Sequence, residues 1–285
     1  MQKDKTTDGN RLVNRRNTLR TMGSVGALML SPSLVNGRKT PVEAFKNKIR
    51  ASLKRRDQDD DFGNWEKRLE KNGFGVKSIE KKYNISKEKE ESSGPSIEYF
   101  LKYDTKLRLT LVYDCDASAY YSEIAFNHDL SRNGEAPLDY AGLSWNGGEW
   151  FLEGNTLSEQ VETSGYVYAD DDADGSFSGS GAAFEVYDGA ISQRGSDSKY
   201  YYGGVYLRTA DDDVNAEDRG IWGAYTHTWN DVDITGVSVG MPKSLSVSVS
   251  NVDYKWRSAY NHGGDGTYLR VFESDADLQN CGGVQ

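Results

Sequence analysis

Cysteine is almost absent from this chain of 285 residues, which contains only Cys115 and Cys281. Two thiols are too few for a disulfide scaffold or for a cluster of thiolates around a metal ion. They could pair and tie the C-terminal tail to a strand, or stay as separate thiols, and the sequence leaves both open. A chain of this length can bury a sizeable hydrophobic core without such support.

Lysine is scarce beyond residue 106, where only Lys199, Lys243 and Lys255 occur. The formal net charge is −10. Residues 1–95 hold 22 Lys and Arg against 13 Asp and Glu, a net +9, and residues 96–285 hold 12 against 31, a net −19. Such an acidic part argues against a nucleic acid partner, because phosphate binding needs clustered lysine and arginine. We favour a solvated acidic coat instead.

The combination of few lysines and many short acids resembles that of secreted proteins from salt-loving archaea. Acidic runs occur, for example, at 170–174 and 211–218. The resemblance implies strong salt as the working solvent, in which the self-repulsion of an acidic surface is screened.

An arginine pair, Arg15 and Arg16, stands near the N-terminus with Leu19 after it, and a short apolar stretch follows over residues 22–30. This segment resembles the twin-arginine export signal, although Thr18 stands where that pattern carries a large apolar residue. The resemblance implies that the twin-arginine translocase exports the chain as a folded protein. We therefore expect an extracellular location.

Small residues at 35–37 are spaced for cleavage, so residues 1–37 are the predicted signal peptide and the mature chain would begin near Arg38. The apolar stretch is too short to span a bilayer, which takes about 20 apolar residues. We expect no membrane span in the mature form. The cleavage region also has no cysteine for a lipid anchor.

Residues 38–95 form a basic region that we expect to be partly helical. Thr40, Pro41 and Glu43 resemble a helix start with a capping box, which predicts a helix over 41–56. A second, shorter helix should begin at Phe62 and end at Asn72 and Gly73, with Trp65 and Leu69 on its apolar face.

Charged residues and then Ser, Gly and Pro over 87–95 predict a linker or exposed loop. We place the domain boundary there, between the basic region and an acidic domain at 96–285. The region before it could be a propeptide, a tethering stalk, a two-helix lid or a partly ordered arm.

Beyond residue 95 the apolar residues alternate with polar ones, as half-buried strands require. The clearest case is the segment 244–250, where leucine and valine alternate with serine. The predicted strands are 107–113, 120–126, 138–145, 149–153, 165–169, 182–187, 200–208, 221–229, 234–239, 244–250 and 267–272. No amphipathic helix and no fixed repeat separates them, so we predict a mainly β fold, an antiparallel β-sandwich or jelly roll.

Asp170, Asp172 and Asp174, followed by Gly175, give the alternating carboxylates that begin a calcium loop. Gly181 stands where the last ligand should be, which excludes a helix-loop-helix site. No cofactor is indicated otherwise, but calcium could bind between strands through these three aspartates. A salt-adapted acidic loop is the favoured alternative.

Catalytic motifs are absent. The three histidines, His128, His227 and His262, show no close metal-binding spacing, and Ser144 lacks the glycine of a nucleophile elbow. Glycosidase chemistry would need two facing carboxylates, for which the strands offer Glu123, Glu149, Glu153 and Glu185. The sequence therefore favours a protein that is not an enzyme.

Aromatic residues are numerous, and exposed flat rings stack on sugars or on partner proteins, whereas buried rings fill a core. The candidate binding residues are Trp145, Trp150, Tyr201, Trp222 and Trp229. The run 200–202 cannot point inward throughout, so at least one ring should face solvent or an added element.

The leading hypothesis is a secreted, non-enzymatic β-sandwich that acts by binding a cell envelope, a polysaccharide or a protein partner. One alternative is an antimicrobial protein, because some halocins resemble this layout of an export signal, a basic N-terminal part and a separate active part. The other is a jelly-roll glycan hydrolase that uses two of the glutamates.

Overall fold

The computed structural model describes residues 40–59, 62–85, 103–128, 138–187, 200–210, 214–228, 233–240, 244–250, 255–258 and 269–276. The chain divides into residues 1–38 and residues 39–285, and the described residues all belong to the second unit. None of the helices in the described ranges is long and apolar enough to cross a membrane.

Two helices precede the first strand. Helix α1 spans Pro41–Asp59 and α2 spans Phe62–Lys71. The predicted capping box of α1 is present, because the Glu43 amide donates to Thr40 Oγ1 at 3.2 Å and the Thr40 amide donates to Glu43 Oε2 at 3.3 Å. Gly73 follows α2 with φ of 85°, as a helix end of this kind requires.

The first sheet, called here the helix-side sheet, has the strand order β1-β2-β3-β9-β5, and β6 also pairs with β9. Its strands are β1 (Gly75–Ile85), β2 (Tyr103–Asp114), β3 (Ala119–His128), β5 (Trp150–Leu152), β6 (Val161–Thr163) and β9 (Tyr201–Thr209). A short helix, α3 (Leu157–Gln160), lies between β5 and β6 in the chain.

The second sheet, called here the hairpin-side sheet, has the order β13-β10-β4-β8-β7, and β14 also pairs with β10. Its strands are β4 (Asp139–Trp145), β7 (Val167–Asp170), β8 (Gly181–Val186), β10 (Gly220–Thr228), β13 (Lys255–Arg257) and β14 (Leu269–Phe272). A short 3-10 helix over Glu273–Asp275 follows β14. The separate hairpin of β11 (Ile234–Gly240) and β12 (Ser244–Val249) packs against β4, β8 and β10.

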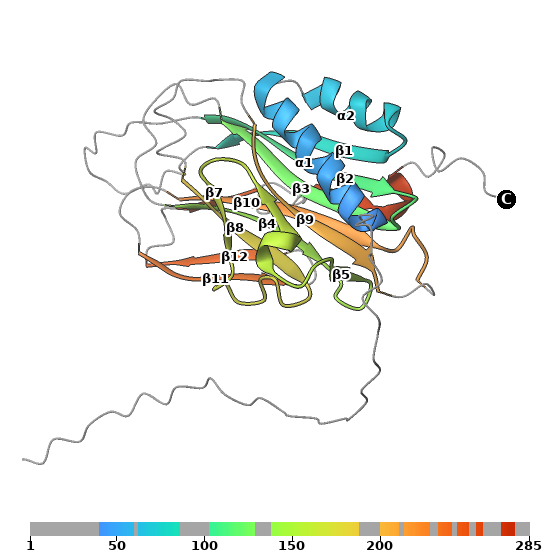
Figure 1. Ribbon diagram of the computed structural model, residues 1–285. Helices are drawn as coiled ribbons and strands as arrows, with labels where there is room; N and C mark the ends of the chain where they lie inside the picture. The colour runs from blue at the N-terminus through green and yellow to red at the C-terminus, as the bar shows by residue number, and fades with distance from the viewer. Residues whose placement is uncertain are drawn as a thin grey trace, which may run out of the picture. The chain divides into compact units, whose positions relative to one another are not determined.

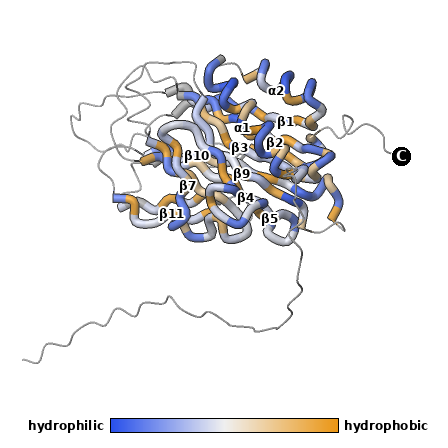
Figure 2. Tube along the Cα trace, in the orientation of Figure 1, coloured by the Kyte–Doolittle hydropathy of each residue, from blue (hydrophilic) through white to orange (hydrophobic). Residues whose placement is uncertain are grey.

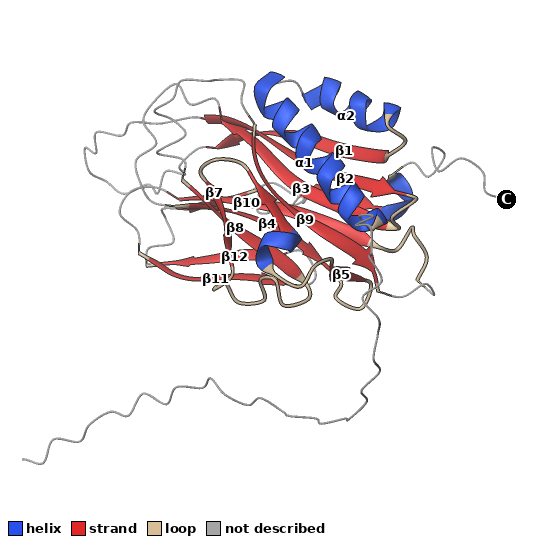
Figure 3. Ribbon diagram, in the orientation of Figure 1, coloured by secondary structure: helices blue, strands red, loops and turns tan. Residues whose placement is uncertain are grey.

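The elements stack as layers, with α1 and α2 on the helix-side sheet and the hairpin on the far side of the other sheet (Figures 1 and 3). The main core lies between the two sheets and includes the inward faces of β2, β3, β4 and β8. All pairs of strands within the sheets are antiparallel. The predicted mainly β, antiparallel sandwich with helices at its N-terminal side is confirmed.

Alternation along single strands accounts for these layers. Leu107, Leu109 and Leu111 of β2 point into the core between the sheets, and Leu245 and Val247 of β12 pack on the hairpin-side sheet. Hydrophobic residues accordingly recur along the strands, whereas α2 is largely hydrophilic (Figure 2).

The sequence predicts a domain boundary near residue 95, whereas residues 39–285 cluster as one compact unit. Strand β1 pairs with β2 along its whole length, from Gly75 opposite Tyr113 to Ile85 opposite Tyr103. This strand was not predicted from the sequence, since its Lys and Glu side chains obscure the pattern. Such charges are typical of a strand at a sheet edge, where β1 lies. The linker predicted over 87–95 lies outside the described residues.

Candidate functional site

The structure corrects most of the predicted binding aromatics. Trp145 and Trp150 are fully buried, and Tyr201 is 5 % exposed, so these rings fill the core between the sheets and cannot stack on a ligand. The Trp145 indole donates to the Gly179 carbonyl at 3.0 Å, which satisfies its only polar atom. Trp222 is partly buried on β10. Trp229 lies outside the described residues.

The predicted calcium loop does not gather its carboxylates. Asp170 Oδ1 accepts the backbone amides of Asp172 at 3.2 Å and Ala173 at 3.1 Å, which closes a turn. Asp174 lies opposite Ser238 of the hairpin in a parallel bridge, in which its amide donates to the Val237 carbonyl and its carbonyl accepts from the Val239 amide. In the part of the chain that the structure describes, no group of three metal-binding side chains occurs. Asp170, Asp172 and Asp174 are therefore not gathered into one group among the described residues.

Three of the four candidate glutamates are held by other side chains. Glu123 pairs with Arg56, Glu153 pairs with Arg208, and Glu149 accepts a hydrogen bond from the Asn146 amide. Glu185, on β8, differs in that partial burial and then the charge of the nearby Asp170 raise its pKa, while its hydrogen bond with Tyr140 lowers it. The other three make contacts typical of structural acids.

Cys115 follows β2 and is disulfide-bonded. Cys281, the only other cysteine of the chain, lies outside the described residues. The pairing between them stays a prediction.

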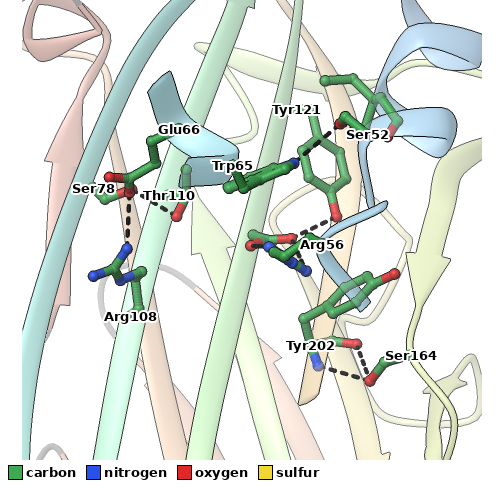
Figure 4. Close-up of polar contacts among 12 residues, drawn as sticks. Ser52, Arg56, Trp65, Glu66, Ser78, Arg108, Thr110, Tyr121, Ser164 and Tyr202 are labelled. Atoms are coloured by element: carbon green, nitrogen blue, oxygen red, sulfur yellow. Dashed lines mark hydrogen bonds and ion pairs between the residues drawn. The ribbon is translucent and has the colours of Figure 1, made fainter. Parts of the chain in front are cut away.

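A buried polar network lies between the helices and the helix-side sheet. Arg56 of α1 forms a two-point ion pair with Glu123 of β3, and the Tyr121 hydroxyl donates to Glu123 Oε2 at 2.9 Å. The Arg56 guanidinium also lies 4.5 Å from the Trp65 ring and 4.3 Å from the Tyr202 ring (Figure 4). Since both charged side chains are almost fully buried, the network serves to dock the helices.

A second buried network fixes β4 to β10. Asp139, fully buried, accepts hydrogen bonds from the Tyr225 hydroxyl and from the Thr228 amide, the latter at 2.9 Å. His227 Nδ1 lies 2.8 Å from Asp139 Oδ2. His227 lies on β10, within the predicted strand 221–229, and shares a face with Tyr225. The side chains of His128 and His262 lie outside the described residues.

The candidate functional site is a group of four side chains, Tyr168, Asp170, Glu185 and Tyr187, called here the tyrosine–carboxylate patch. Residues two apart on a strand point the same way, so Tyr168 and Asp170 share one face of β7. Glu185 of β8 and Tyr187, which directly follows β8, lie on that same face of the sheet. Tyr168 stands opposite Glu185 in the pairing of these strands. The strands lie side by side at one edge of the hairpin-side sheet (Figure 1).

The two tyrosines of the patch are exposed. Tyr168 is 54 % and Tyr187 41 % exposed, and their rings lie perpendicular to each other with centroids 5.3 Å apart. The hairpin covers Tyr140 and Ala183 on the same face of the sheet but leaves both rings open. Exposed rings of this kind can stack on a ligand.

The two carboxyl groups of the patch have raised pKa values. Partial burial is the main cause for each, and the charge of Asp170 adds to it for Glu185, while Asp172 and Asp171 add to it for Asp170. A hydrogen bond with Tyr140 partly offsets the rise for Glu185, and the two backbone amides do so for Asp170. Burial and the neighbouring acids thus disfavour the ionised form of both carboxyl groups.

We expect Glu185→Gln to raise the melting temperature at neutral pH by about 1–3 °C. A carboxyl group with a raised folded-state pKa binds its proton more tightly when folded, so the wild-type protein loses stability as the pH rises through that pKa. The gain should vanish on acidification toward the ordinary value of 4.5, where Glu185 is protonated. Thermal unfolding across pH measures this. Glu217→Gln removes an exposed charge elsewhere and is the matched control; an equal gain there, or a loss with Glu185→Gln, would contradict the account.

The patch was not predicted from the sequence, although a signal was present. In 167–170, Val and Ala alternate with Tyr168 and Asp170, and in 182–187, Ala, Phe and Val alternate with Glu185 and Tyr187. The same alternation that predicts each strand places these four side chains outward. Their meeting depends on β7 pairing with β8, which no local pattern shows.

No protein-family model matches the chain, and no curated protein matches it.

Proposed function

We propose that this protein is a secreted, non-enzymatic β-sandwich that binds a polysaccharide through the tyrosine–carboxylate patch. The observation that carries the proposal is the exposed, perpendicular pair of Tyr168 and Tyr187 beside the carboxylates of Asp170 and Glu185. Aromatic rings stack on the apolar faces of sugars, and carboxylates accept hydrogen bonds from sugar hydroxyls. The predicted export signal supports an extracellular ligand.

The position of the patch on an open surface also favours a role in ligand binding over a structural role. The patch lies on the open face of two paired strands, whereas the polar networks around Glu123 and Asp139 are buried and engaged in holding layers together. A rigid sheet that presents rings to solvent suits the recognition of a long, repetitive chain.

We expect Tyr168→Ala and Tyr187→Ala each to weaken polysaccharide binding about tenfold, because each removes one ring face from the ligand. The measurement is calorimetry of the protein from residue 39 onward with soluble glycan fragments in molar salt, using neutral, amino and uronic sugars. Phe151→Ala is the matched control, since Phe151 is 43 % exposed but lies on β5 of the other sheet. Undiminished binding in both tyrosine variants, or no binding of any glycan, would refute the proposal.

Glycan hydrolysis is a second candidate, favoured by the neighbouring carboxyl groups of Asp170 and Glu185 and their raised pKa values. The same samples distinguish the two functions. Hydrolysis would release new reducing ends, and Glu185→Gln would stop that release while leaving binding in place. A pure binding protein would release none. The halocin-like alternative rests on the layout of the sequence, and no contact among the described residues favours it.

A further inference from the structure

We infer that the polysaccharide bound at the tyrosine–carboxylate patch carries free amino groups, which as ammonium ions lie between the two carboxylates and against the tyrosine rings. This inference rests on the proposed function and specifies the ligand of the same site. It is carried by the charge complementarity of the patch, by its paired rings and by the contrast with the arginine-paired glutamates elsewhere among the described residues.

Carboxylates in the described part of this protein often have a cationic partner. Glu123 is paired with Arg56, Glu153 with Arg208, Glu162 with Arg50, and Glu273 with Arg219. Arg108 likewise bridges Glu66 and Glu80. The fold thus repeatedly places an arginine where an acid is partly or wholly removed from water.

The patch departs from this pattern. Among the described residues, no lysine, arginine or histidine forms an ion pair with Asp170 or Glu185. The groups that act on them are further acids, Asp171 and Asp172, together with the Tyr140 hydroxyl and the two backbone amides of the turn. Two partly buried carboxylates that have no cationic partner among the described residues form a surface to which a positive ligand group is complementary.

The two tyrosine rings give a second reason why the patch should prefer a positively charged ligand group. Tyr168 and Tyr187 present two perpendicular ring surfaces beside the acids, and an ammonium group gains energy over the face of an aromatic ring. A metal ion fits less well, because calcium takes six to eight oxygen ligands and no group of three metal-binding side chains occurs among the described residues. A uronic acid polymer would be repelled by both carboxylates.

The test compares two ligands of equal length that differ only in the amine: oligosaccharides of glucosamine and of N-acetylglucosamine. Calorimetry uses the protein from residue 39 onward, at a pH that keeps the amine protonated. We expect the free-amine oligosaccharide to bind at least about tenfold more tightly. The double variant Asp170→Asn/Glu185→Gln should lose this preference and still bind the acetylated form as the wild-type protein does.

The control is Glu217→Gln/Asp218→Asn, which removes the same charge from two exposed positions in the turn before β10, at the opposite end of the sheet. It should keep the preference. Equal binding of both oligosaccharides overturns the inference but leaves polysaccharide binding standing. Absence of binding to any glycan overturns the proposed function itself. Polylysine that binds the wild-type protein but not the Asp170→Asn/Glu185→Gln variant, while neither oligosaccharide binds, would assign the patch to a protein partner and overturn both.

Discussion

Replacing Glu123 with leucine is expected to lower the free energy of unfolding by about 3–5 kcal/mol, because it leaves the Arg56 guanidinium buried without its partner. Arg56→Met should cost a similar amount, since Glu123 is fully buried in the middle of the helix-side sheet. The remaining contacts of Arg56 with aromatic rings cannot replace a carboxylate. Urea unfolding in molar salt measures the change.

The double variant Arg56→Met/Glu123→Leu should be more stable than either single variant, because it leaves no uncompensated charge. Arg55→Met is the matched control: this residue precedes Arg56 on α1 but is exposed, so its replacement should change stability by less than about 0.5 kcal/mol. Additive losses in the double variant would show that the ion pair does not couple the two residues. Because the pair is shielded from solvent, raising the salt concentration should not reduce its contribution.

Removing residues 39–73 is expected to abolish cooperative folding. The two helices bury an apolar face made of α1 and α2 residues with Val112, Tyr121, Tyr202 and Tyr206 of the helix-side sheet. Without them this face would meet water, and Glu123 would lose Arg56. Lys46 would also no longer donate to the Glu153 and Glu159 carbonyls, each at 2.7 Å. Near-ultraviolet circular dichroism and thermal unfolding should show no sharp transition.

The control for this truncation is the chain that begins at residue 39, which should unfold in a single transition. A shortened protein that starts at residue 74 and keeps the melting temperature of the control would contradict the account. In that case the helical region would be a detachable propeptide or lid, as the sequence alone allowed.

Much of the fold could be predicted because the signals for single helices and strands depend only on residues that are neighbours in the chain. The serine and leucine or valine alternation of β12, the capping box at Thr40 and Glu43, and the glycine at the end of α2 each need only neighbouring residues. The ion pair between α1 and β3 joins residues 67 positions apart in the chain. Strands β7 and β8 are consecutive in the chain, but the loop over residues 171–180 separates them. No spacing or composition signals those contacts.

The aromatic residues show why burial was harder to predict than strands. Alternation separates core from solvent only when one face of a sheet is open, and here helices and a hairpin cover much of the outer faces. Strand β9 is therefore buried on both sides from Tyr201 to Leu207. The expectation that the run 200–202 meets solvent or an added element is confirmed, since Tyr200 and Tyr202 pack beneath the helices.

Because helices and the hairpin cover much of both sheets, the exposed tyrosines of the patch stand out from the other aromatic residues. The exposed large hydrophobic side chains among the described residues are Phe151, Tyr168 and Tyr187, and two of the three stand together beside Asp170 and Glu185. Elsewhere in the described ranges most aromatic rings are buried and many acids form ion pairs. In the patch, the rings are exposed and the acids form no ion pair with a described residue. Ligand binding is the role that such a surface serves.

The most direct test is a nuclear magnetic resonance titration of the protein with its tyrosines isotopically labelled, using the glucosamine oligosaccharide as ligand. Single Tyr→Phe variants assign the Tyr168 and Tyr187 signals. The account predicts that these two ring signals shift with added ligand while those of the buried Tyr121 and Tyr206 do not. Shifts confined to other tyrosines would place the ligand elsewhere and contradict the central claim.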